Sequence, residues 1–226
     1  MDPTPATVYV VDDDAQVRRA LERLIRAMGY RVSAFGSAAD FLAAHDSECT
    51  GCIILDVAMP DCDGLDLQRQ LKESGRDRPI IFLTGHGSIP LSVQAMKAGA
   101  VTFLTKPISE RELAAVLSEA IALDCASRQT RATQSIVLKR LDSLTRRERQ
   151  VLQYVVEGRL NKQIAAELGT VEQTVKVHRA RVMKKMGARS VAELVRYATS
   201  VEWAAMGRSP PHGAEDGIGM SASSQE

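Results

Sequence analysis

The sequence predicts a doubly wound parallel α/β domain followed by an all-α domain, and three observations support this prediction. Five short apolar runs alternate with amphipathic helical patterns over about the first 120 residues. Most of these runs end directly on acidic, hydroxyl or basic side chains. Farther along the chain only helical patterns follow, and the excess charge changes from negative to positive.

The strands are expected where apolar runs are bounded by turn-forming residues. The run from Ile53 to Leu55 is fully apolar and ends abruptly on Asp56, and a proline and an Asp-rich turn follow. Such a run is typical of a strand that is covered on both faces of a parallel sheet. The five expected strands span residues 8–11, 30–35, 53–55, 79–83 and 101–104.

The helices of the first domain are predicted by apolar residues along one face and by capping signals at their starts. Ser37 with Asp40, and Ser109 with Glu112, have the spacing of capping boxes. The expected helices span residues 17–28, 65–73 and 93–98, with a shorter one opening at Ser37 and another that opens at Ser109 and runs through Ile121.

Four helical patterns follow in the basic part of the chain. Their signals are, in order, a capping box of Thr145 and Glu148, Asn161 as a cap, a longer helix from Glu172 to Met186, and Ser190 opening the last helix. A short helix, a turn and a longer helix in this order have helix-turn-helix spacing.

Composition divides the chain into four segments. Residues 1–123 carry 12 Lys and Arg against 17 Asp and Glu, whereas residues 124–226 carry 17 against 11. We therefore expect only the second part to meet a polyanion. The expected segments are the α/β domain 1–123, a linker 124–140 that can extend the preceding helix, a helical domain 141–206, and a disordered Gly-, Ser- and Pro-rich tail 207–226.

Two classes of protein are disfavoured by composition. No apolar run approaches the ~20 residues that span a bilayer, and the amino terminus lacks a secretory pattern, so we expect a cytoplasmic protein without membrane contact. Cys49 and Cys52 have CxxC spacing, but no second pair or nearby histidine supports a zinc or redox site.

The ends of four expected strands bring related side chains to one edge of the sheet. They are Asp12 with Asp13, Asp56, Thr84 and Lys106. Close carboxylates repel one another, and a hard divalent cation such as Mg²⁺ relieves this repulsion. With an ammonium and a hydroxyl nearby, the cluster suits a phosphoryl group arriving at an aspartate. A structural salt-bridge cluster with Lys106 as counter-ion is the alternative, which four separate strand ends disfavour.

Four motifs at these strand ends carry a resemblance to a known family. They are Val10–Asp14, Leu55–Pro60, Leu83–Gly87 and Lys106–Pro107. With them the chain resembles two-component response regulators of the FixJ/NarL family with a LuxR-type output domain, and is most similar to the FixJ branch. The resemblance covers about residues 6–123 and 141–203. It implies a flavodoxin-like receiver domain followed by a four-helix DNA-binding domain.

The resemblance implies that Asp56 accepts a phosphoryl group from the phosphohistidine of a sensor histidine kinase. Mg²⁺ would be bound by Asp13, Asp56 and the Ala58 backbone carbonyl, with Asp12 acting partly through water. The family often has a basic or polar residue where this chain has Ala58. This difference leaves a carbonyl contact intact but can alter the rate of autodephosphorylation.

The resemblance also assigns the switch residues. Lys106 would pair with the phosphoryl oxygens, and Thr84 would move to hydrogen-bond one of them. Phe103 lies where the family has a switch aromatic, although a core role in its strand is an equally good interpretation. A cis peptide is implied between Lys106 and Pro107. His86 is interpreted as a feature of the FixJ-type loop and not as a general base.

The longest helix of the second domain divides into two faces. At 100° per residue, Val182 and Met186 fall within about 20° of Val175, and these three form a buried stripe. The other side carries small and cationic residues, as a recognition helix in the DNA major groove requires. A merely solvated face is the alternative, and Lys185 and Arg189 fit either interpretation. The predicted DNA contacts are Thr174, Lys176, Val177, Ala180, Arg181 and Lys184, with Lys176 and Val177 at bases.

Together these features predict a transcription factor switched by phosphorylation. The phosphorylated receivers would pair as a homodimer and bring two output domains onto double-stranded promoter DNA, or would release a held output domain. RNA polymerase is a further expected partner, and activation is the family's commoner mode. The signal, the kinase and the operator are not specified by the sequence.

Two other functions fit parts of this pattern. A metal-dependent phosphohydrolase would need an acid two residues after its nucleophile and a substrate-capping insertion, but Ala58 stands there and no insertion is present. A DNA-binding protein whose first domain only dimerises would not need the intact set of strand-end residues. We therefore expect a protein that is not an enzyme, apart from the receiver's own phosphotransfer and autodephosphorylation.

Overall fold

The computed structural model describes residues 6–44, 49–60, 62–75, 78–85 and 89–205, without the side chains of residues 201–205. The chain forms two compact units, Met1–Thr130 and Arg131–Glu226. The division falls within helix α5 (Glu110–Asp142), inside the segment predicted to be a linker. His86 and the predicted disordered tail lie outside the described residues.

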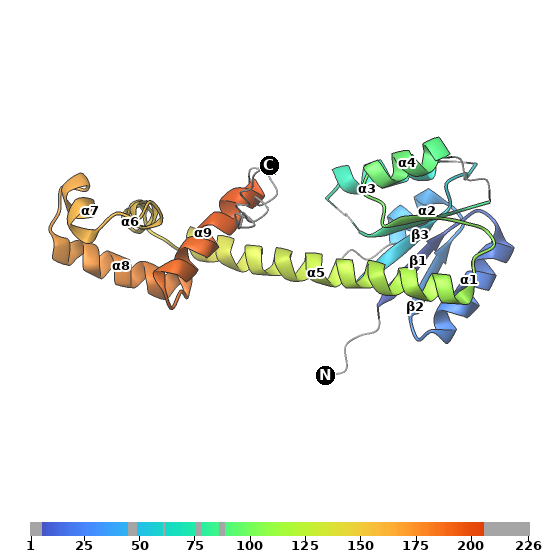
Figure 1. The fold of residues 1–226 in the computed structure, drawn as a ribbon, viewed down its shortest axis with the longest axis horizontal. Helices are drawn as coiled ribbons and strands as arrows, with labels where there is room; N and C mark the ends of the chain where they lie inside the picture. The colour runs from blue at the N-terminus through green and yellow to red at the C-terminus, as the bar shows by residue number, and fades with distance from the viewer. Residues whose placement is uncertain (1–5, 45–48, 61, 76–77, 86–88, 206–226) are drawn as a thin grey trace, which may run out of the picture. The chain divides into compact units, whose positions relative to one another are not determined.

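The first unit contains a five-stranded parallel sheet with the strand order β2-β1-β3-β4-β5 (Figure 1). This order is that of the flavodoxin-like fold, so the predicted fold class is confirmed. All five predicted strands are present: β1 (Thr7–Val11), β2 (Arg31–Phe35), β3 (Gly51–Leu55), β4 (Ile80–Thr84) and β5 (Thr102–Thr105).

Helices cover both faces of this sheet because side chains alternate along each strand. Val8 and Val10 of β1 belong to the core that α1 and α5 cover, whereas Tyr9 and Val11 belong to the core beneath α2, α3 and α4 (Figure 1). The four helices between strands are α1 (Ala15–Ala27), α2 (Ala38–Ala44), α3 (Gly64–Glu73) and α4 (Ile89–Lys97). Among the described residues, no helix is long and apolar enough to cross a membrane.

The second unit is helical, as predicted. Its core contains Val151 of α6, Ile164 of α7 and Val175 of α8, and Val137 near the end of α5 joins the same core. The capping box of Thr145 and Glu148 is confirmed at the start of α6. The four helices are α6 (Arg146–Val156), α7 (Asn161–Glu167), α8 (Glu172–Met186) and α9 (Val191–Ala205).

The predicted role of Asn161 as a helix cap is wrong. Helix α7 begins at Asn161 itself, and Leu160 occupies the N-cap position. The Leu160 amide donates to the side chain of Gln163 at 2.8 Å, so the backbone amide at the N-cap has a hydrogen-bond acceptor without Asn161. The Asn161 side chain instead accepts a hydrogen bond from Arg179 Nη1 at 2.9 Å. Asn161 therefore joins α7 to α8.

Candidate functional site

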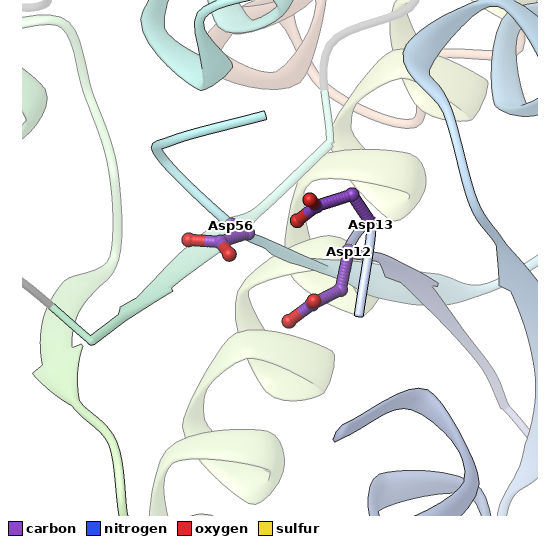
Figure 2. Close-up of side chains that lie close together, drawn as sticks. All are labelled: Asp12, Asp13 and Asp56. Atoms are coloured by element: carbon purple, nitrogen blue, oxygen red, sulfur yellow. The ribbon is translucent and has the colours of Figure 1, made fainter. Parts of the chain in front are cut away.

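Strand register brings three aspartates together at the carboxyl edge of the sheet. Val11 of β1 pairs with Leu55 of β3, so Asp12 and Asp56 follow on neighbouring strands. Figure 2 shows both side chains beside that of Asp13. One carboxylate oxygen from each lies within 4.8 Å of the others. Asp12 and Asp56 are buried and Asp13 is exposed, which leaves one ligand open to solvent.

Lys106 lies directly against this acidic cluster. Its Nζ donates to Asp12 Oδ2 at 2.6 Å and to Asp56 Oδ2 at 2.8 Å. Burial lowers the pKa of Lys106, but the bonds to the two carboxylates raise it more, and the net pKa lies above its ordinary value. For the acid Asp12, burial instead raises the pKa, although the hydrogen bond from Lys106 opposes this shift. The ammonium therefore stays charged beside Asp56 at neutral pH.

The backbone around Asp56 is closely packed. The Ala58 amide points at the Asp56 carboxylate, with N and Oδ1 3.4 Å apart. Gly64, the first residue of α3, donates its amide to Val57 O at 2.9 Å. A Cβ on Gly64 would meet the Asp56 carbonyl oxygen. This close approach of Gly64 to the Asp56 backbone was not predicted from the sequence, although a glycine in the Asp-rich turn is a signal for it.

Arg18 of α1 is a second site residue that sequence reasoning missed. Its Nη1 donates to the Asp12 carbonyl oxygen at 2.6 Å, which fixes the backbone that carries the acid pair. Gly36 lies beside this guanidinium, and a Cβ there would make only an ordinary van der Waals contact with Nη1, at 3.4 Å. The helix itself begins at an N-cap, Asp14, whose side chain accepts from the Gln16 and Val17 amides. No pattern in the sequence distinguishes Arg18 from its basic neighbours.

Thr84 and Phe103 lie on the two strands beyond β3. Thr84 ends β4 and is buried, and its carbonyl accepts from the Lys106 amide at 2.8 Å. Phe103 is partly buried against the core, with its ring centroid 6.2 Å from that of Phe82. Phe103 is thus packed as its predicted core role requires, and its switch role stays a prediction. The cis peptide between Lys106 and Pro107 is confirmed.

Helix α8 has the two faces that its sequence predicts. Val175, Val182 and Met186 are fully buried, as expected for the inner stripe. Lys176 is exposed and pairs with Glu172 at 3.2 Å, an exposed ion pair that contributes little stability. Of the predicted DNA contacts, Thr174 is half-buried, and the exposed ones are Lys176, Val177, Ala180, Arg181 and Lys184.

The structure gives Lys185 a partner inside its own domain. Its Nζ donates to Glu148 Oε2 at 2.6 Å and to Ser143 O at 3.0 Å. The bond from Lys185, together with the Thr145 amide, lowers the pKa of Glu148 to about 2. Glu148 is 3% exposed, so its charge depends on these donors rather than on water.

We expect Glu148→Gln to destabilise the second unit in a pH-dependent way. The folded-state pKa of about 2 lies below the ordinary 4.5, so the carboxylate stabilises the fold fully above pH 4.5. This contribution is lost as the pH falls toward 2. Denaturant unfolding should therefore give a lower free energy of unfolding for the variant than for the wild type at pH 7, and this difference should be smaller at pH 3.

Glu167→Gln is the matched control, because that carboxylate is half-exposed and pairs with Arg159 at the surface. It should change the free energy of unfolding little at any pH. If Glu148→Gln lowered the free energy of unfolding equally at pH 7 and pH 3, the stabilising role of the Glu148 charge would be contradicted.

The structure disfavours reaction of the Cys52 thiol only through its burial, and it leaves Cys49 half-buried and not joined to Cys52. No disulfide joins Cys49 and Cys52, both of which lie in the described part of the chain. Cys52 is fully buried in β3, and burial raises its pKa to about 12. A thiol that stays protonated at neutral pH is a poor nucleophile and metal ligand.

The sheet with its acidic cluster and the helical unit with its exposed cationic helix define a signal-receiver domain joined to a DNA-binding domain. Residues 8–118 match the response regulator receiver domain family, and residues 142–198 match the LuxR family of bacterial regulatory proteins. The chain belongs to the two-component response regulators of the FixJ/NarL family and is a transcriptional regulator. A receiver domain implies a histidine kinase partner, and the LuxR-type domain implies DNA binding.

Relatives share both domains with this chain. The response regulator protein TodT of Pseudomonas putida is 47% identical over 87% of this chain and 86% of its own. Nodulation protein W of Bradyrhizobium diazoefficiens is 44% identical over 88% and 87%. Among solved structures, that of the response regulator StyR covers 87% of this chain and 99% of its own, with 45% identity and a TM-score of 0.77.

Proposed function

We propose that Asp56 is the phosphoacceptor and that its phosphorylation controls DNA binding by the second unit. The observation that carries this proposal is the placement of Lys106, which contacts both Asp56 and Asp12 beside the three clustered aspartates. A phosphoryl group on Asp56 would need positive charge beside it, and Lys106 supplies one such charge.

Phosphotransfer is a displacement at phosphorus. An oxygen of Asp56 attacks the phosphoryl group of a kinase phosphohistidine, the phosphorus–nitrogen bond breaks, and the imidazole departs. The Lys106 ammonium then pairs with a phosphoryl oxygen, and Thr84 turns its hydroxyl toward another. Phe103 follows inward as Thr84 moves, which changes the surface of α4 and β5.

The cluster fits a hard divalent cation, because it offers only oxygen ligands and one of them, Asp13, faces solvent. Asp13, Asp56 and the Ala58 carbonyl would bind Mg²⁺, with Asp12 acting partly through water. When bound, Mg²⁺ neutralises charge on the phosphoryl oxygens. With Ala58 two residues after the acceptor, no acid is placed to serve a small-molecule leaving group, which supports a regulator rather than a phosphohydrolase.

The output is promoter binding as a homodimer in the cytoplasm. The exposed face of α8 supports the DNA-binding part of this proposal, with Lys176 and Val177 at bases and the other predicted contacts at phosphates. Two copies would occupy two half-sites and recruit RNA polymerase to activate transcription. We assign residues 1–123 to the receiver, 124–140 to the linker, 141–206 to the DNA-binding domain and 207–226 to a tail.

Incubation with acetyl phosphate tests the metal and the dimer together. With Mg²⁺ present, we expect phosphorylation followed by a shift to dimer mass in size-exclusion chromatography with light scattering. Excess EDTA should prevent both, because the carboxylates repel the incoming phosphoryl group without a cation. Phosphorylation that persists in EDTA would contradict the metal assignment, and a phosphorylated monomer would contradict the dimer.

A further inference from the structure

The carboxyl-terminal end of α8 is held by a side chain from α5. Arg140 Nη1 donates to the carbonyl oxygen of Met186, the last residue of α8, at 2.8 Å. Carbonyls in the last turn of a helix have no partner within that helix, and they form the negative end of its dipole. A guanidinium is therefore a favourable cap at this position. Arg140 lies before the residues 142–198 that match the LuxR family.

A second charged contact joins the same helix end to the start of α6. Lys185 donates to Ser143 O and to Glu148, which also accepts from the Thr145 amide at 2.8 Å. The group that caps α6 is thus also the group that holds α8. Both contacts involve residues 131–226 alone, and so belong to the second unit.

Gly187 makes room for the first contact. It has φ +65°, the left-handed conformation of a helix C-cap. A Cβ on this residue would lie 2.8 Å from Arg140 Nη1, closer than real side chains approach. Glycine is therefore favoured here by its backbone conformation, and a Cβ would displace the Arg140 guanidinium from its present position.

We propose that Arg140, Lys185 and Glu148 form a clasp that sets the orientation of α8 on DNA, and that Arg140 is a positioning residue for operator binding. This rests on the proposed function of α8 as the recognition helix. Lys176 lies ten residues before Met186, or about 15 Å along the helix at 1.5 Å per residue. A tilt of roughly 4° at the clasp thus moves Lys176 by roughly 1 Å, enough to misplace a hydrogen bond to a base.

The test compares operator and random-sequence DNA in the full-length protein. The operator duplex is first selected with wild-type protein from a genomic pool. We expect Arg140→Ala to weaken operator binding by roughly tenfold, the scale of a lost charged hydrogen bond. Binding to a random-sequence duplex, which depends on total charge, should fall no more than it does in Arg147→Ala, an exposed arginine of α6 and the matched control. Arg140→Lys should restore part of the operator affinity.

Gly187→Ala provides a second variant that leaves the net charge unchanged. It should lower operator affinity without changing affinity for random DNA or the salt dependence of binding, and circular dichroism should show an intact helical domain. Equal losses on operator and random DNA for Arg140→Ala and Arg147→Ala, or operator binding by Gly187→Ala at wild-type strength, would overturn the clasp. Failure of the wild type to select any sequence would instead refute the proposed function.

Discussion

Asp56→Asn is expected to reduce phosphoryl incorporation to background and to abolish the gain in operator affinity that phosphorylation gives. The amide keeps the size and shape of the carboxylate but lacks a nucleophilic anionic oxygen. It also removes one of the two negative charges that pair with the Lys106 ammonium. Labelling from acetyl phosphate or a cognate kinase, followed by acid- and base-stability of the label, measures the first effect. Operator titration before and after phosphorylation measures the second.

Asp66→Asn on α3 is the control, since that carboxylate is exposed and pairs only with nearby Arg69 at 3.0 Å in the described structure. It should be phosphorylated like the wild type. If Asp56→Asn still accepts phosphoryl at the wild-type rate, another carboxylate is the acceptor, and Asp13 is the first to examine.

Lys176→Ala is expected to weaken operator binding by about 1–3 kcal/mol and to relax the preference at one base pair, as the loss of a direct base contact does. The exposed ion pair with Glu172 breaks at little cost to folding, so the effect should appear in recognition rather than in stability. Binding to a set of operators, each changed at one base pair, measures both the affinity and the preference.

Lys184→Ala separates base recognition from phosphate contact on the same helix. Lys184 is predicted to hold a phosphate, so its loss should weaken binding to all sequences about equally and reduce the salt slope by about 1. If Lys176→Ala also weakened all duplexes equally, Lys176 would be a phosphate contact and the predicted base contact would be wrong.

The sequence was informative wherever local periodicity or strand order determined position. Val175, Val182 and Met186 could be placed in the core because the helical repeat alone puts them on one side. Asp12, Asp56 and Lys106 could be placed together because parallel strands end at a common edge. The capping box of Thr145 and Glu148 followed from spacing, since its contacts span only three residues.

Contacts between distant segments could not be predicted in this way. In the sequence nothing distinguishes Arg18, Arg140 and Lys185 from other exposed cations. The partners of Arg140 and Lys185 lie on other helices, and the partner of Arg18 lies at the end of the preceding strand. Asn161 was misplaced for a related reason: its side chain is used by Arg179, 18 residues later, and the cap falls one residue earlier. Helix ends are the least certain feature of a sequence pattern.

By itself the sequence determined the order of strands and helices, the acidic edge of the sheet and the inner face of α8, because each depends on periodicity or on chain direction. Only the tertiary structure decided that Arg18 holds the backbone of Asp12, that Lys185 binds Glu148 and that Arg140 caps α8. A charged side chain acquires its role from the geometry of its partner, and that geometry exists only after the chain has packed.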